Sequence, residues 1–221
     1  ARPTIDIDLL GEHISNDREN LKGVFQKVCA IECEDDGVTF DAASLELEPI
    51  AVEKKYPGTC VKVVAHLDTI LQKVSVDIGF GDVVTPYPLS LDYPLLLPGV
   101  PAVELYAYSL ETFIAEKFHA MVDESNSRMK DFFDVYQLFT NHEIDTELLA
   151  EAIVCTFKNR NTPYRENLAL FTDKFAADST RNVLWKAFLK KIRWKEQIDF
   201  SVVMKCVKEN LQEYWSRETL G

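Results

Sequence analysis

The sequence has no long apolar run, and its cysteines and histidines lack the spacing of a disulfide framework or a zinc site. No stretch approaches the roughly 18 to 20 consecutive apolar residues of a transmembrane helix, and no basic-then-apolar leader opens the chain. The five cysteines form no CxxC pair and the four histidines form no HExxH spacing. We therefore expect a cytoplasmic protein with no membrane partner and no zinc chemistry.

Basic side chains are also few relative to acidic ones. Lys and Arg total 24 against 36 Asp and Glu, which gives a formal net charge of -12 at pH 7. An acidic chain does not attract nucleic acid through its overall field, so RNA binding would require a local basic patch. With 221 residues, 47% of them apolar, the chain is long enough for one large domain or two small ones.

The one candidate for a basic patch is "RNVLWKAFLKKIRWK", residues 181–195. It carries six cations and no acid, interleaved with three aromatic residues. Periodicity favours an amphipathic helix that buries the aromatic side chains and leaves the basic face in solvent. RNA binding is the alternative, and its candidate residues are Lys186, Lys190, Lys191 and Arg193.

Hydrophobic periodicity divides the chain into an α/β part and a helical part. In the first part we predict a helix over 16–31, capped by Asn16, and strands near 4–10, 45–50, 61–68, 73–80 and 103–107. Five of the nine prolines lie in residues 86–101, which we expect to form an extended, irregular connector. Further helices are predicted over 109–122, 127–140, 145–157, 164–175, 180–193 and 198–214. The expected class is α+β, with domains at 1–107 and 108–221.

Acidic residues recur on the polar faces of two predicted strands. "TIDIDLLG", residues 4–11, places Asp6 and Asp8 on one face, and "VSVDIGFGD", residues 74–82, places Asp77 likewise. If the strands are neighbours in register, three carboxylates converge, and Mg²⁺ is a cation that prefers such oxygens. Two such ions suit an in-line phosphoryl transfer. A solvated sheet face without a ligand is the alternative, and the pattern leaves both open.

Two predicted helices carry charged residues that their apolar pattern does not explain. In "SLETFIAEKFHAMVD", Lys117 lies within the core-facing stripe, so its amine either snorkels to the edge or meets a carboxylate or phosphate. In "RMKDFFDVYQLF", the polar residues share one narrow face, which periodicity alone assigns to solvent. They are Lys130, Asp131, Asp134 and Gln137.

Four ordered segments, "RPTIDIDLLG", "VSVDIGFGD", "AYSLETFIAEKFHA" and "RMKDFFDVYQLF", resemble the motifs of the AbiEii/AbiGii family of nucleotidyltransferase-like toxins. The resemblance runs from residue 2 to about 140. It implies a DNA polymerase β-like nucleotidyltransferase core, with a mixed sheet and flanking helices, followed by an all-helical domain. It also implies two Mg²⁺ ions and nucleotide transfer from an NTP to an acceptor, which is tRNA in studied relatives. The toxin is expected to be paired with an antitoxin.

The resemblance also assigns roles to residues of the two acidic strands. Asp6 and Asp8 correspond to the metal-binding pair, and Thr4 to the small hydroxyl residue ahead of them at the nucleotide. Asp77 corresponds to the third acid of the sheet, which would hold a metal and help to deprotonate the acceptor.

In the helical part, Lys117 corresponds to the family's lysine that contacts the triphosphate. Asp131 corresponds to the acid of the last motif, and Asp134 accompanies it. The matching favours functional roles for Lys117 and Asp131. The family's glycine-rich segment upstream of the Asp-x-Asp strand would precede Ala1, so this chain departs from the family there. Two alternatives follow: a catalytically degenerate binding module of the same fold, or a nucleotidyltransferase that acts on a small molecule.

Overall fold

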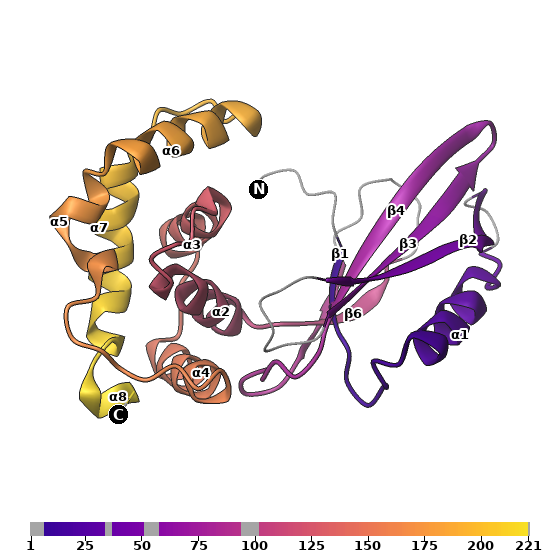
Figure 1. The fold of residues 1–221 in the computed structure, drawn as a ribbon, viewed down its shortest axis with the longest axis horizontal. Coiled ribbons are helices and arrows are strands. Elements are labelled where there is room, and N and C mark those ends of the chain that lie inside the picture. Colours follow the sequence, from indigo (N-terminus) through magenta and orange to yellow (C-terminus); the bar gives the residue numbers. More distant parts are fainter. Residues whose placement is uncertain (1–6, 34–36, 51–57, 94–101, 221) are drawn as a thin grey trace. The chain divides into compact units, whose positions relative to one another are not determined.

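The computed structural model describes residues 7–33, 37–50, 58–93 and 102–220 (Figure 1). The chain forms two compact units, residues 1–82 and 83–221, and each has its own hydrophobic core. The first unit contains a mixed sheet with one helix, and the second contains a two-stranded sheet followed by helices. The α+β class expected from the sequence is confirmed. The domain limits of 1–107 and 108–221 stay a prediction.

The first unit is built on a four-stranded sheet with the strand order β1-β4-β3-β2. Its strands are β1 (Ile7–Leu10), β2 (Val38–Ile50), β3 (Gly58–Leu67) and β4 (Ile70–Gly79). β1 runs parallel to β4, whereas β3 is antiparallel to both β2 and β4. The sheet is therefore mixed, as the family resemblance implies.

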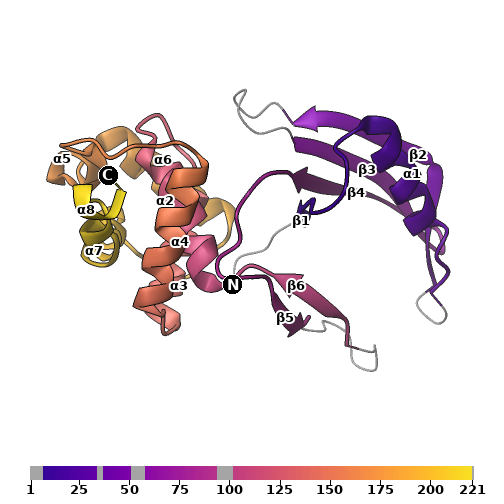
Figure 2. The same ribbon diagram turned by 90° about the horizontal axis from the view of Figure 1, so that it is seen from below.

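Helix α1 (Arg18–Cys29) lies against one face of this sheet (Figures 1 and 2). Its Leu21 side chain is fully buried among apolar side chains of the strands. The helix is capped by Asp17 rather than by the predicted Asn16, because the Asp17 carboxylate accepts the backbone N–H of Asn20 at 3.0 Å. Since side chains alternate along a strand, polar residues are left on the opposite face of the sheet.

The second unit opens with a β-hairpin of β5 (Leu89–Asp92) and β6 (Glu104–Ala107). β5 falls within the proline-rich segment that we expected to be an irregular connector. The two strands pair with each other in a two-stranded sheet, so each keeps an open edge. Pro86 and Pro88 precede β5, so they remove no hydrogen bond from the strand itself.

The helices of the second unit follow the predicted positions except over 164–175 and at the short helix Arg217–Leu220, which was not predicted. They are α2 (Leu110–Val122), α3 (Met129–Asn141), α4 (Thr146–Asn159), α5 (Asp173–Ala176), α6 (Ser179–Lys191), α7 (Phe200–Leu211) and α8 (Arg217–Leu220). The single helix predicted over 164–175 is wrong. That segment contains a 3₁₀ turn (Ala169–Phe171) and the short α5, whose first turn is capped by the Thr172 hydroxyl. Among the helices of the described residues, none is long and apolar enough to cross a membrane.

Aromatic packing fixes these helices around one core. The ring centroids of Phe118 and Phe157 are 5.3 Å apart, joining α2 to α4. Those of Phe132 and Phe200 are 5.4 Å apart and join α3 to α7. Because α2 and α3 are held on several sides, the charged residues between them have fixed positions.

Candidate active site

Asp8 and Asp77 are direct neighbours on the polar face of the sheet. The parallel pairing of β1 with β4 places Asp8 opposite Asp77, and neighbouring strands lie about 4.8 Å apart. The residues that flank Asp77 in sequence, Val76 and Ile78, are buried on the other face. The in-register arrangement on which the sequence hypothesis depended is therefore present for these two acids.

The remaining two residues of the predicted N-terminal motif, Thr4 and Asp6, lie outside the described residues. Their proposed roles at the nucleotide and the metal stay predictions. In the described part of the chain, no group of three or more His, Cys, Asp or Glu side chains is arranged to hold a metal ion. Asp8 and Asp77 thus supply two carboxylates, the donor type that Mg²⁺ prefers, of the three that the sequence analysis assigned.

The negative charges of the two carboxylates lie close together. At about 5 Å, two such charges repel by roughly 3 kcal/mol at an effective dielectric constant of about 20. The lysines on this face are already paired, Lys62 with Glu48 and Lys73 with Glu46 at 2.9 Å. Within the ranges that the structure describes, neither aspartate has an ion-pair partner. A bound cation would relieve this repulsion.

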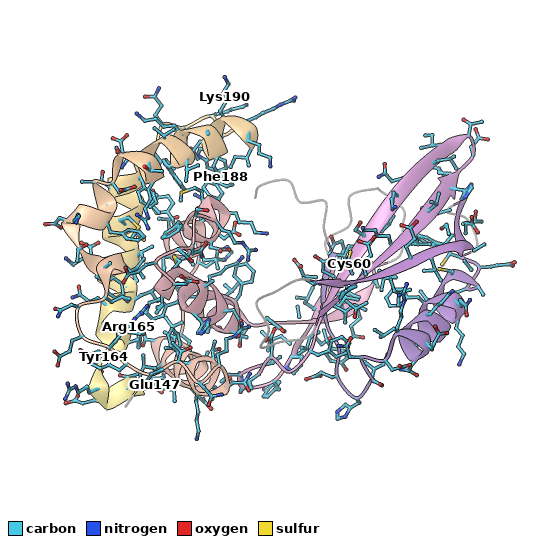
Figure 3. All side chains as sticks on the ribbon, in the orientation of Figure 1. Cys60, Glu147, Tyr164, Arg165, Phe188 and Lys190 are labelled. Carbon is cyan, nitrogen blue, oxygen red and sulfur yellow. The ribbon has the colours of Figure 1, made fainter. Side chains whose placement is uncertain are left out.

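Cys60 lies on the other side of Asp77, at the directly opposite position of β3 (labelled in Figure 3). Burial of the thiol, together with its hydrogen bond to the Asp77 carboxylate, raises the pKa of Cys60 to about 11. At neutral pH the thiol is therefore protonated and donates to that carboxylate. The sequence analysis missed this residue, because the register between β3 and β4 that makes it a neighbour of Asp77 is not visible in local periodicity.

Asp82, just beyond β4, is an acid that was not singled out from the sequence. Gly79 shares the face of Asp77, since the two residues are two positions apart on one strand. A Cβ atom at Gly79 would lie 3.7 Å from Asp82 Oδ2, so this carboxylate lies over the same end of β4. The signal was present in "VSVDIGFGD", but the position of a residue after a strand is not fixed by alternation.

In the second unit, Lys117 of α2 forms an ion pair with Asp131 of α3. The Lys117 Nζ atom is 2.6 Å from Asp131 Oδ1, 3.9 Å from Asp134 Oδ2 and 5.1 Å from the centroid of the Phe113 ring. The side chain of Asp131 is 1% exposed and that of Lys117 is 16% exposed. Lys117 therefore meets a carboxylate instead of snorkelling into solvent. The assignment of the α3 polar face to solvent is wrong for Asp131, because the packing of α2 on α3 covers it.

The second oxygen of Asp131 faces the loop between α2 and α3. Asp131 Oδ2 is 3.6 Å from Arg128 Nε and 3.5 Å from Asn126 Nδ2. Asn126 also donates to the Ala120 carbonyl at 2.8 Å, which ties the loop to the end of α2. One buried carboxylate thus organises side chains from α2, the loop and α3.

The beginning of α2 is fixed by buried hydroxyl groups. Ser109 caps the helix by accepting the backbone N–H of Thr112 at 3.0 Å. The Thr112 hydroxyl donates to the Thr85 carbonyl at 2.8 Å and accepts the Thr85 N–H at 3.2 Å. These bonds set the position of the helix two turns before Lys117.

Helix α6 and the turn that follows it present the basic residues that we predicted as RNA candidates. Lys186, Lys190, Lys191 and Arg193 are exposed, whereas Trp185 is 1% exposed in the core. Figure 3 shows Lys190 and Phe188 projecting from opposite sides of this helix, and Phe188 packs against Phe133 with centroids 5.6 Å apart. The aromatic side chains of this segment pack on the core and its four candidate basic side chains lie in solvent, as periodicity predicts, although Val183 and Leu184 are exposed as well.

The comparison with protein families identifies the class to which this arrangement belongs. A mixed sheet with acids on its polar face, followed by helices, is the α+β arrangement that the family resemblance implies. The family model described as "Nucleotidyl transferase AbiEii toxin, Type IV TA system" matches residues 1–205. The chain belongs to this family of nucleotidyltransferase toxins.

Two crystal structures from Helicobacter pylori resemble the chain. JHP933 has 16% sequence identity and a TM-score of 0.47, over 99% of this chain and 78% of that one. The other protein, provisionally described as a nucleotidyltransferase, has 14% identity and a TM-score of 0.41, over 96% and 81%. A search of the curated proteins found no match.

Removal of the Lys117 charge is expected to destabilise the helical unit. Lys117→Met should lower the free energy of unfolding by about 3 to 5 kcal/mol, because Asp131 would remain as a buried charge without its nearest cation. Urea unfolding followed by fluorescence measures this, since all three tryptophans lie in residues 83–221. The double variant Lys117→Met/Asp131→Asn should lose less free energy of unfolding, because it leaves no unpaired buried charge. Equal stability of the single variant and the unaltered chain would contradict the assignment.

The raised pKa of Cys60 predicts slow alkylation. Because only the thiolate reacts, carbamidomethylation of Cys60 should be slow at pH 8 and rise about tenfold per pH unit toward pH 11. Cys33, which is exposed, is the internal comparison in peptide mass spectrometry. Asp77→Asn removes one cause of the shift and should lower the pKa of Cys60. Labelling of Cys60 as fast as Cys33 at pH 7.5 would show that the thiol is not held as described.

Proposed function

We propose that this toxin transfers a nucleotide from an NTP to tRNA in a magnesium-dependent reaction. The observation that carries the proposal is the pairing of Asp8 with Asp77 on adjacent strands, which brings two uncompensated carboxylates together. Membership of the AbiEii nucleotidyltransferase toxin family supplies the reaction class. We also propose a cognate antitoxin as partner, since the family is one of type IV toxin–antitoxin systems. A cytoplasmic location is part of the same proposal.

In this proposal the acids of the sheet act on the metal and on the acceptor. Asp8 and Asp77, with Asp6, would hold Mg²⁺, which when bound supplies positive charge to the phosphate oxygens. Asp77 also takes the proton of the acceptor hydroxyl, whose oxygen forms the new bond to the α-phosphorus. The bond to the β-phosphate oxygen breaks and pyrophosphate leaves. The Cys60 thiol, as donor to Asp77, orients that carboxylate.

Lys117 is proposed to contact the triphosphate, and Thr4 and Asp134 to assist at the nucleotide. Support for Lys117 comes from its placement: the amine is held by Asp131 and partly shielded, so little conformational freedom is lost when it binds a phosphate. Asp131 is then the residue that positions the amine. A shielded ammonium group also interacts more strongly with a phosphate than one in bulk water.

RNA is favoured as acceptor over a small molecule by the basic surface of α6. Four exposed cations follow one another within eight residues in a chain whose net charge is -12. Such a local patch is what an acidic protein needs to bind a polyanion. Arg181, at the start of the helix, is different: its guanidinium lies 3.9 Å from the centroid of the Phe175 ring and donates to the Glu124 carbonyl, so it is structural.

Loss of either sheet acid should abolish transfer. With a labelled NTP, Mg²⁺ and total tRNA, the unaltered protein should label the RNA, and Asp8→Asn or Asp77→Asn should reduce the rate by at least about 100-fold. Glu48→Gln is the matched control, because Glu48 lies on the same face but is paired with Lys62. Full transfer by either aspartate variant would refute the proposed chemistry. A protein that binds no NTP and transfers nothing would favour the degenerate binding module.

Charge reversal on α6 tests the acceptor. Lys190→Glu/Lys191→Glu/Arg193→Glu should weaken tRNA binding, and the slope of log K against log salt should fall by roughly 2 to 3. Filter binding over a range of salt concentrations measures this slope. Lys205→Glu/Lys208→Glu on α7 is the control. Unchanged tRNA affinity and salt dependence would count against RNA binding by α6.

A further inference from the structure

Asp131 is compensated by a cation at each of its two oxygens. Lys117 Nζ lies 2.6 Å from Oδ1, and Arg128 Nε lies 3.6 Å from Oδ2. The two cations differ in exposure: the Lys117 side chain is 16% exposed and that of Arg128 is 60% exposed. One buried carboxylate therefore holds a shielded amine and an accessible guanidinium next to each other.

The charges around Lys117 determine whether an anion is attracted or repelled there. Lys117 has two carboxylates within 4 Å, those of Asp131 and Asp134. These three groups alone carry a formal charge of -1, so they would repel a polyphosphate. Arg128 brings the formal sum to zero. The positive charge of Arg128 at Asp131 therefore favours the binding of a phosphate at Lys117.

The backbone of Arg128 is anchored beside Asp131. Its backbone N–H donates to Asn126 Oδ1 at 2.8 Å, and Asn126 itself contacts Asp131. Among the described residues, Asp131 is the one ion-pair partner of the Arg128 guanidinium, through Nε. The remaining N–H groups of the guanidinium form the planar fork that matches the oxygens of a phosphate group.

We propose that Arg128 and Lys117 together form the binding site for the triphosphate of the nucleotide, with Asp131 as the residue that positions both cations. This inference rests on the proposed function and names a binding residue that the sequence analysis did not single out. The amine supplies a point charge, and the guanidinium supplies two directed donors. The charge of Arg128 offsets one of the two carboxylates at Lys117 and so favours the approach of a polyanion.

The test uses the full chain and inorganic tripolyphosphate, which requires no transfer. By titration calorimetry, Arg128→Gln should raise the Kd about tenfold or more, because a charged donor pair is lost. Arg128→Lys, which keeps the charge but not the fork, should give an intermediate Kd. Arg217→Gln is the matched control, since it removes an exposed cation paired with Glu166 on the same unit, and it should change the Kd less than about twofold.

Each outcome decides the inference. A Kd of Arg128→Gln equal to that of the unaltered chain, or no binding of tripolyphosphate by the unaltered chain, would overturn it. Weaker binding of tRNA by Arg128→Gln with unchanged binding of tripolyphosphate would also overturn it. Arg128 would then contact the phosphates of RNA and not those of the nucleotide. If Arg128→Gln does not fold, as judged by circular dichroism, Arg128→Lys decides by the same comparison. If tripolyphosphate binding depends on Arg128 but the protein transfers no nucleotide, the binding site is supported and the proposed function is refuted.

Discussion

The parallel pairing of β1 with β4 is the constraint on which the rest of the account depends. It places Asp8 beside Asp77 on the polar face of the sheet, because alternation along the strands points the apolar side chains toward the opposite face. A shift of one residue would bury one acid under α1 and separate the pair. Because buried residues such as Val76 and Ile78 specify the register, the hydrophobic core determines where the two charges lie. Stability and chemistry are thus linked through the same strand.

A different constraint organises the second unit. Asp131 is almost completely buried, and a buried carboxylate is tolerated only when cations and hydrogen-bond donors surround it. Lys117, Asn126 and Arg128 meet this requirement from α2 and the following loop. The helical unit therefore fixes an ammonium group in place through packing and charge compensation, whereas the sheet unit keeps two like charges uncompensated. The two arrangements suit a polyphosphate and a divalent cation respectively.

Strand alternation and helical periodicity were sufficient to predict the fold class, most elements and the faces of Asp8, Asp77 and Lys117. They could not predict that Cys60 neighbours Asp77, because strand register depends on tertiary pairing. Periodicity also placed Asp131 in solvent, since one helix carries no information about the helix that will cover it. The helix predicted over 164–175 failed for a local reason: Thr172 followed by Asp173 is a helix-start signal, which the apolar period concealed.

The central claim is that the adjacent sheet carboxylates bind a divalent cation, and binding of Mn²⁺ in place of Mg²⁺ tests it most directly. Titration of the full chain with Mn²⁺, followed by electron paramagnetic resonance of the free ion, measures affinity without nucleotide or acceptor. We expect saturable Mn²⁺ binding by the unaltered chain. The affinity should fall by about tenfold or more in both Asp8→Asn and Asp77→Asn and stay unchanged in Glu48→Gln. Equal Mn²⁺ binding by all four proteins, or no binding by the unaltered chain, would contradict it.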